Sequence, residues 1–433
     1  MPAVIEDSLQ IILEDFIEEN DIPGGVLAVQ SRGGEWTWEG QNGEANINTM
    51  QSANTSFHYR IGSISKQFLA VTIMHLVEND VLSLTDTIGK WLNPLLMNEI
   101  PYSEQITIKH LLNHTSGIFS YTEDTQFLTA LLTDPNATFT PDSLINIGVS
   151  HPPQFVPGND WSYNNTGYVM LAKIIEEASG ISYHQYATDS ILAPAELDST
   201  YYPTSNIITT DHMRCYADYT GDQVLEDYTD VTETWAYGSG EIVSTLDDQL
   251  LYYNKLLDGQ IISPTSYAEL RTPFYPDPNY TYGLGTYIIN NNLIGHSGLY
   301  FSTTGLWHFE DLDVLIAYQF NLYDVPVFDL LGKIKTLLMS NNVSVFEVKA
   351  NTDKIVSVYP NPATENLTVE FANFSGDEQI YLYNITGKEV KKWIPQSKIE
   401  TFDIKGLAPG IYTVVIQSND KTLEKQKVVI SNR

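Results

Sequence analysis

Residues 60–71 read RIGSISKQFLAV, in which two serines and a lysine lead directly into an apolar run. The run continues through Val77 and is apolar almost all round a helical wheel, so we expect a buried helix. At about 100° per residue, Ser63 and Lys66 lie about 60° apart on one face, whereas Ser65 lies about 200° from Ser63. Ser63 is therefore the serine that can meet Lys66.

A lysine in the first turn of a buried helix is near the positive end of the helix dipole and is partly desolvated. Both effects lower its pKa, so that a neutral amine can take a proton from a serine hydroxyl. An N-cap serine beside a lysine that reaches solvent would leave the same pattern. S-x-x-K also occurs at Ser418–Lys421, in a predicted hairpin turn. The motif alone does not separate a catalytic pair from a capped helix.

A second group of polar residues is PGNDWSYNNTGY, residues 157–168, which precedes a helical pattern. Tyr163 and Asn165 form Y-x-N there. A phenol near a lysine can relay a proton, and an amide two residues on suits a hydrogen bond to a substrate carbonyl. Y-x-N recurs at 252–254 and 359–361, and a turn with a packed tyrosine is the alternative.

The third motif is IGHSGLYFSTTG, residues 294–305, on a predicted strand. It places His296, Ser297 and Gly298 in a row, and Gly298 would allow a substrate backbone to approach closely. The N–H group of Leu299 could serve an oxyanion hole. A single strand histidine is more often structural.

In this order, the three motifs resemble the serine β-lactamase and penicillin-recognising hydrolase family. The similarity is to class C β-lactamases, D-Ala-D-Ala carboxypeptidases, D-aminopeptidases and related esterases. ITIKHLLNHTSGI (106–118) and GSGEIVSTLDDQ (238–249) resemble further segments of that family. The resemblance covers roughly residues 5–340, and several dispersed matches in the right order are more specific than any triplet.

The resemblance implies that Ser63 is the acylated nucleophile. Lys66 and Tyr163 would share the role of base, and which of the two is the base stays open. The backbone N–H groups of Ser63 and Leu299 would form the oxyanion hole. No cofactor and no metal are implied.

The resemblance also implies that Asn165 positions the substrate amide and that residues 296–298 bind substrate. His296 stands where many members have lysine, and Asn164 replaces a common serine. A histidine is only partly charged at neutral pH, whereas a permanent cation suits the carboxylate of a β-lactam. We therefore expect a peptidase or esterase acting on a peptide or small molecule. A true β-lactamase and a non-catalytic binder remain alternatives.

Strand patterns lie at both ends of the first 340 residues and helical patterns lie between them. This order predicts an α+β fold in which an antiparallel sheet is flanked by terminal helices and carries an inserted helical lobe, as in β-lactamases and transpeptidases. The predicted domains are a hydrolase domain at 1–342, a linker at 343–354 and a small all-β sandwich at 355–433.

The formal net charge of the chain is −32. Residues 351–433 hold equal numbers of basic and acidic side chains, so the excess lies in the first 350 residues. A surface this acidic repels phosphate backbones, which excludes nucleic acid as an expected partner. The single cysteine, Cys215, has no zinc spacing around it, and His110 and His114 have no evident third ligand. We expect Cys215 to be a small buried side chain and His114 to make a loop hydrogen bond.

The tail segments VYPNPATENLTVEF, IYLYNITGKEV and GLAPGIYTVVI resemble the type IX secretion C-terminal sorting domain of Bacteroidota, over residues 353–433. This implies export by the type IX machinery through residues 355–433, then release or attachment to the outer-membrane surface. An ancillary sandwich that binds carbohydrate is the alternative. We expect neither a signal peptide nor a transmembrane segment in this sequence.

Overall fold

The structure is a computed structural model that describes residues 3–219, 221–274, 279–341, 356–359, 363–371, 374, 376–384, 388–418 and 421–430. Contacts divide the chain into two compact units, Met1–Val345 and Phe346–Arg433. The predicted linker, 343–354, lies outside the described residues. Each unit is described below by itself.

The larger unit is built on an eight-stranded antiparallel sheet with the order β3-β2-β1-β12-β11-β10-β9-β8. Its strands are β1 (Gly24–Ser31), β2 (Thr37–Asn46), β3 (Gln51–Ser52), β8 (Tyr280–Tyr282), β9 (Tyr287–Ile289), β10 (Leu293–Leu299), β11 (Thr303–Phe309) and β12 (Val314–Phe320). β1 pairs with β12, with Gly25 opposite Phe320. The prediction of one sheet made from both ends of the unit is confirmed.

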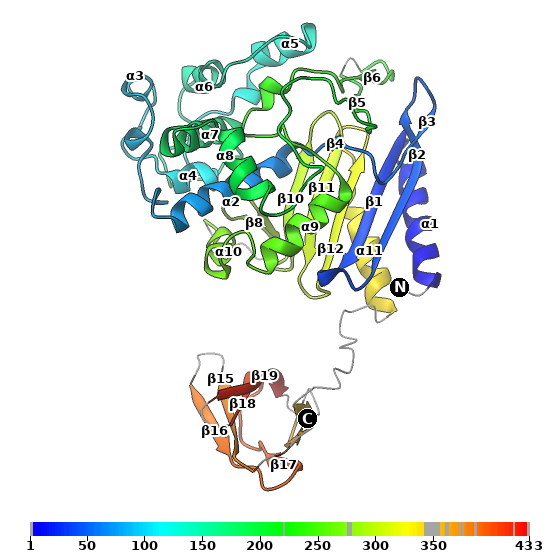
Figure 1. The fold of residues 1–433 in the computed structure, drawn as a ribbon, viewed down its shortest axis with the longest axis vertical. Helices are drawn as coiled ribbons and strands as arrows, with labels where there is room; N and C mark the ends of the chain where they lie inside the picture. Colours follow the sequence, from blue (N-terminus) through cyan, green and yellow to red (C-terminus); the bar gives the residue numbers. More distant parts are fainter. Residues whose placement is uncertain are drawn as a thin grey trace. The chain divides into compact units, whose positions relative to one another are not determined.

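Helices cover both faces of this sheet (Figure 1). α1 (Ala3–Glu19) and α11 (Val327–Ser340) pack on one face, where Leu27 and Val29 of β1 belong to the same apolar cluster as these helices. The alternate residues of β1, Val26 and Ala28, point to the opposite face of the sheet. There they belong to a second apolar cluster, which also contains the buried residues of the lobe helices. This two-residue alternation is what a strand between two packed layers requires.

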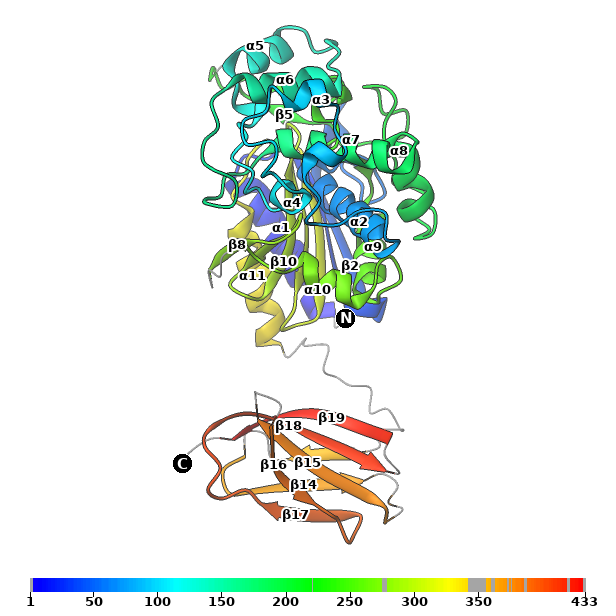
Figure 2. The same ribbon diagram turned by 90° about the vertical axis from the view of Figure 1, so that its left-hand side faces the viewer.

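The lobe is the helical segment between β4 (Tyr59–Arg60) and β8. Figure 1 shows most of its helices on the side of the sheet away from α1 and α11, and Figure 2 is the view from that side. Its helices include α2 (Ser65–Glu78), α4 (Ile108–Leu112), α5 (Thr125–Thr133), α6 (Pro141–Ser150), α7 (Asn165–Ser179), α8 (Tyr183–Ala187), α9 (Leu246–Leu257) and α10 (Pro264–Leu270). α2 is buried along almost its whole length, as its apolar sequence predicts. It packs against α7 of the lobe and against β10 of the sheet.

The smaller unit consists of two antiparallel sheets that enclose a core of their own. One contains β13 (Val356–Tyr359), β14 (Asn366–Phe371) and β17 (Ile399–Asp403), and the other contains β15 (Glu378–Asn384), β16 (Glu389–Trp393), β18 (Gly410–Ser418) and β19 (Lys421–Ile430). Phe371 and Ile380, one from each sheet, are fully buried in this core. The region has the all-β character that its turn-rich sequence predicts.

Candidate active site

Ser63 lies in a single 3₁₀ turn, Gly62–Ile64, that leads into α2. The α-helix itself begins at Ser65, so the serine stands just before the helix rather than within it. Gly62 has a φ of +55°, and a Cβ there would lie 2.7 Å from the backbone nitrogen of Leu299. Only glycine permits this conformation and this approach without strain, so the turn that holds Ser63 rests directly on the end of β10.

The Lys66 side chain meets Ser63, as the helical spacing predicts. Its Nζ lies 3.0 Å from Ser63 Oγ and also donates to the backbone carbonyl of Ser239 at 2.6 Å. Ser65 faces elsewhere, and its Oγ accepts a hydrogen bond from the N–H of Ile242. Lys66 is fully buried, which lowers the pKa of its amine well below the ordinary value, while the charge of Glu241 opposes this shift.

Tyr163 completes a three-residue cluster with this pair. Its hydroxyl shares a hydrogen bond with the side chain of Ser63, and Lys66 Nζ lies 5.0 Å from the centre of its ring. Desolvation raises the pKa of the Tyr163 phenol above its usual value, and the bond to Ser63 opposes this. The tyrosine is therefore a neutral phenol that can pass a proton, beside an amine that can accept one.

The side chains of Asn164 and Asn165 have different roles. The Oδ1 of Asn164 caps α7 by accepting from the Gly167 N–H at 2.7 Å, and its side-chain amide donates to the carbonyl of Ile118. Asn165 donates from Nδ2 to Thr122 Oγ1 at 2.8 Å and lines the cavity beside Ser63. The asparagine at 164 thus has a structural role of its own, while Asn165 stands where the sequence predicts.

His296 is brought near the cluster but not onto the wall of the cavity. It is 1% exposed, its Nε2 lies 2.9 Å from the Tyr282 hydroxyl, and its ring centre lies 6.3 Å from that of Tyr163. Burial, aided by the charge of Lys66, lowers the pKa of His296 to about 3. The imidazole is therefore neutral at physiological pH and offers no cation to a substrate, in contrast to the partial charge expected from an ordinary histidine.

The remaining residues of the third motif lie on β10, which contacts the turn that holds Ser63. A Cβ on Gly298 would lie 2.0 Å from the Ile61 carbonyl oxygen, so this glycine admits the protein's own backbone. Leu299 is 37% exposed and lines the cavity together with Ser63. Ser297, which precedes them in β10, is partly buried and does not line the described cavity.

A cavity of about 290 Å³ opens beside Ser63, Tyr163 and Asn165. α5 contributes Phe127, Leu128 and Leu131 to its wall, and the residues that complete it include Trp235, Ser239, Phe301, Tyr219 and Tyr323. The three-residue cluster therefore has a binding space next to it, most of whose wall lies outside the three motifs.

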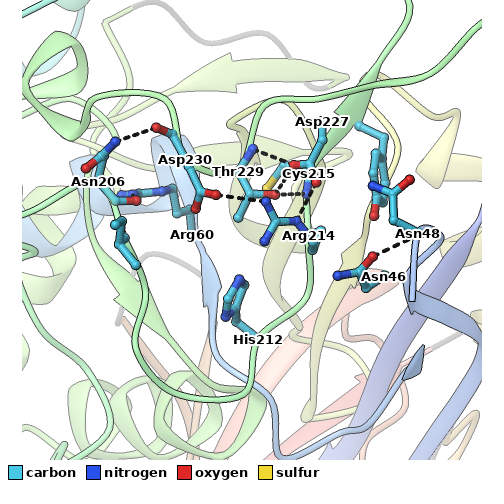
Figure 3. Close-up of polar contacts among 12 residues, drawn as sticks. Asn46, Asn48, Arg60, Asn206, His212, Arg214, Cys215, Asp227, Thr229 and Asp230 are labelled. Carbon is cyan, nitrogen blue, oxygen red and sulfur yellow. Dashed lines mark hydrogen bonds and ion pairs between the residues drawn. The ribbon is translucent and has the colours of Figure 1, made fainter. Parts of the chain in front are cut away.

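Figure 3 shows polar contacts within the long connection that contains Asn206, Arg214 and Asp230. Arg214 forms ion pairs with Asp227 and with Asp230, the latter at 2.9 Å, and the Asn206 side chain donates to the Asp230 carbonyl at 2.6 Å. Cys215 is buried, as expected, and its N–H donates to Thr229 Oγ1. These contacts join residues that are far apart in a loop, so the sequence offered no signal for them.

Sequence reasoning also missed the polar groups behind Lys66. Glu241 is 1% exposed and accepts from the N–H groups of Gly238 and Gly240, which fixes the turn whose Ser239 carbonyl accepts from Lys66. The segment containing these residues resembled the family, and that was the only signal. His114 makes the expected loop hydrogen bond, because its Nδ1 accepts from the Asn164 N–H at 3.1 Å.

Comparison with known proteins agrees with this geometry. Residues 9–333 match the family described as Beta-lactamase, and residues 357–431 match the Secretion system C-terminal sorting domain. Over 67% of its length, the chain is 30% identical to penicillin-binding protein 4* of Bacillus subtilis. It spans just under two thirds, 66%, of that relative.

Solved structures share the fold of the larger unit. A D-stereospecific amidohydrolase from Streptomyces sp. superposes with a TM-score of 0.68 at 27% identity, over 76% of this chain and 97% of that protein. The D-amino acid amidase of Ochrobactrum anthropi SV3 shares the fold at 24% identity, with a TM-score of 0.67 over 78% of this chain and 99% of the amidase. Within the described residues, no helix has the length and apolarity needed to span a bilayer.

The two family matches identify both parts of the chain. The chain therefore belongs to the β-lactamase family of serine hydrolases, and it carries a secretion-system C-terminal sorting domain.

Proposed function

We propose that this protein is a secreted serine hydrolase that cleaves a peptide, amide or ester through an acyl-enzyme on Ser63. The observation that carries the proposal is the 3.0 Å contact between Ser63 Oγ and the buried Lys66 Nζ at the edge of a cavity. Tyr163 is hydrogen-bonded to the same hydroxyl. A serine with a base and a proton relay in reach has the arrangement that nucleophilic catalysis needs.

In the proposed reaction, neutral Lys66 accepts the proton of Ser63 as Oγ attacks the substrate carbonyl. The N–H groups of Ser63 and Leu299 stabilise the resulting oxyanion, and Asn165 holds the substrate amide. As the bond to the leaving group breaks, Tyr163 donates its proton to that group and is reprotonated by the ammonium of Lys66, so the proton of Ser63 is in effect passed on and Lys66 is neutral again. Water then attacks the acyl-enzyme and gives its proton to Lys66, and Ser63 recovers a proton as the acid leaves. The lowered pKa of Lys66 and the raised pKa of Tyr163 both favour Lys66 as the base.

The neutral, buried His296 favours a general hydrolase over a β-lactamase. A β-lactam carries a carboxylate, and His296 has no charge to pair with it at neutral pH. The similarity to an amidohydrolase points in the same direction. The sorting domain supports export by the type IX machinery, with release or surface attachment as the final step.

Intact-mass measurement after reaction with a fluorophosphonate tests the nucleophile. We expect one adduct on the wild type, one on Ser65→Ala and none on Ser63→Ala. Ser65 is the matched control because it lies in the same segment and faces away from Lys66. An adduct on Ser63→Ala would contradict the assignment.

A substrate panel separates the alternatives. Hydrolysis of p-nitrophenyl acetate or D-Ala-p-nitroanilide that Ser63→Ala lacks would support the hydrolase. Nitrocefin turnover comparable with either would support a β-lactamase instead. Failure on all three substrates would favour a non-catalytic binder.

A further inference from the structure

The wall of the cavity beside Ser63 is predominantly apolar and aromatic. Phe127, Leu128 and Leu131 come from one helix, and Trp235 and Phe301 come from two other segments. The rings of Trp235 and Phe301 meet edge to face, with centres 6.1 Å apart. An apolar group that leaves water for this wall gains free energy in proportion to the surface it buries.

The same wall offers no oppositely charged partner to an ionised substrate group. Among the described residues that line the cavity, none carries a formal charge. Lys66, the basic group beside Ser63, directs its amine to Ser63 Oγ and the Ser239 carbonyl, and the buried His296 is neutral. A carboxylate placed here would lose its hydration without gaining a counter-ion, which strongly opposes binding.

Exposed carboxylates near the cavity also oppose the binding of an anionic substrate group. Glu123, Asp218 and Asp324 are exposed and directly follow or precede the lining residues Thr122, Tyr219 and Tyr323. The excess negative charge of the chain also lies in its first 350 residues. Anionic substrates therefore approach against the field of the protein.

Building on the proposed acyl-enzyme function, we propose that the natural substrate delivers an uncharged, apolar acyl group, aromatic or branched, to the cavity, and that acyl groups bearing a carboxylate are rejected. The volume of about 290 Å³ is at the small end for ligand sites, so the cavity fits a single side-chain-sized group. This narrows the substrate from any peptide, amide or ester to neutral acyl donors of modest size.

Three p-nitrophenyl esters test the proposal on the full chain: the acetate, the 3-phenylpropanoate and the monosuccinate. They share a leaving group, and the last two differ in carrying a phenyl ring or a carboxylate at the same position. We expect kcat/KM for the phenylpropanoate to exceed that for the monosuccinate by about 100-fold or more. Comparable values for the two esters would overturn the proposal while leaving the acyl-enzyme function intact. If no ester is hydrolysed faster than by Ser63→Ala, the proposed function itself fails, and the inference fails with it.

A charge introduced into the wall provides a second test. Leu128→Arg places a cation on the partly buried face of α5, and we expect the ratio of monosuccinate to phenylpropanoate kcat/KM to rise at least about tenfold. Leu95→Arg makes the same change at a leucine that is 75% exposed and lies outside this cavity, and it should leave the ratio unchanged. An unchanged ratio in a folded Leu128→Arg protein would show that the cavity does not hold the acyl group.

Discussion

Replacing Gly298 with alanine is expected to displace the segment that holds Ser63 while preserving the fold. The new Cβ would lie 2.0 Å from the Ile61 carbonyl oxygen and 2.3 Å from Thr304 Oγ1. Thr304 Oγ1 itself donates to that carbonyl at 2.8 Å, so the two obstacles are tied together. Because Ile61 is two residues before Ser63, a shift of its carbonyl moves the serine.

The size of the effect follows from these distances. Carbon and oxygen atoms in contact are normally about 3.3 Å apart, so the segment must move by about 1.3 Å. A misplacement of about 1 Å in a catalytic group costs about 100-fold in rate, which corresponds to about 2.7 kcal/mol in the activation free energy. Forcing a methyl group into packed backbone also lowers the free energy of unfolding by about 1–3 kcal/mol.

Ester hydrolysis and thermal unfolding measure the two effects in one preparation. Gly332→Ala is the matched control, because a Cβ at this exposed position in α11 would meet nothing within 4 Å and alanine favours the helix. We expect wild-type kcat/KM for the control and a loss of about 100-fold for Gly298→Ala. Wild-type activity and melting temperature in Gly298→Ala would refute the reasoning.

Three further predictions concern charge and the two units. Glu241→Gln should move the acidic limb of the pH profile of kcat/KM to lower pH. The reason is that the charge of Glu241 raises the pKa of Lys66, whose amine must be neutral to act as the base. A shift of this limb to higher pH would contradict the prediction. The pKa of His296 is lowered from 6.5 to about 3 in the folded chain. As pH falls below about 6.5, the unfolded chain therefore binds a proton that the folded chain does not bind, which lowers the free energy of unfolding. Between pH 7 and pH 4, urea titrations should show the wild type losing about 3 kcal/mol of unfolding free energy more than His296→Gln, and equal losses would contradict the burial argument. Calorimetry of the full chain should show two unfolding transitions, one for each compact unit, whereas a single cooperative transition would mean that the units unfold together.

Local features of this protein were predictable from the sequence because they depend on neighbouring residues. The meeting of Ser63 and Lys66 follows from helical spacing, and the hydrogen bond that joins them has the expected partners. The sheet made from both ends follows from the order of strand and helix patterns along the chain. In both cases the spacing or order of residue types along the chain is enough to predict the feature.

Features that depend on distant segments were not predictable. The carbonyl that accepts from Lys66 belongs to Ser239, 173 positions away, and nothing in SISK indicates it. His296 was placed correctly on a strand, but its burial depends on Tyr282 and Tyr287 from neighbouring strands. The apolar cavity wall likewise forms only when α5 and the segment around Trp235 come together.

The pairing of β1 with β12 determines when, during synthesis of the chain, the sheet can form. Gly25 and Phe320 are neighbours in the finished sheet, so its centre cannot close until synthesis has passed Phe320. The turn that holds Ser63 likewise lacks its support until β10 has been made. Contacts at this sequence separation form slowly, which favours an unfolded chain during early export steps. On the proposed function, Ser63 gains its catalytic surroundings only in a nearly complete unit, so unfinished chains would not hydrolyse substrate inside the producing cell.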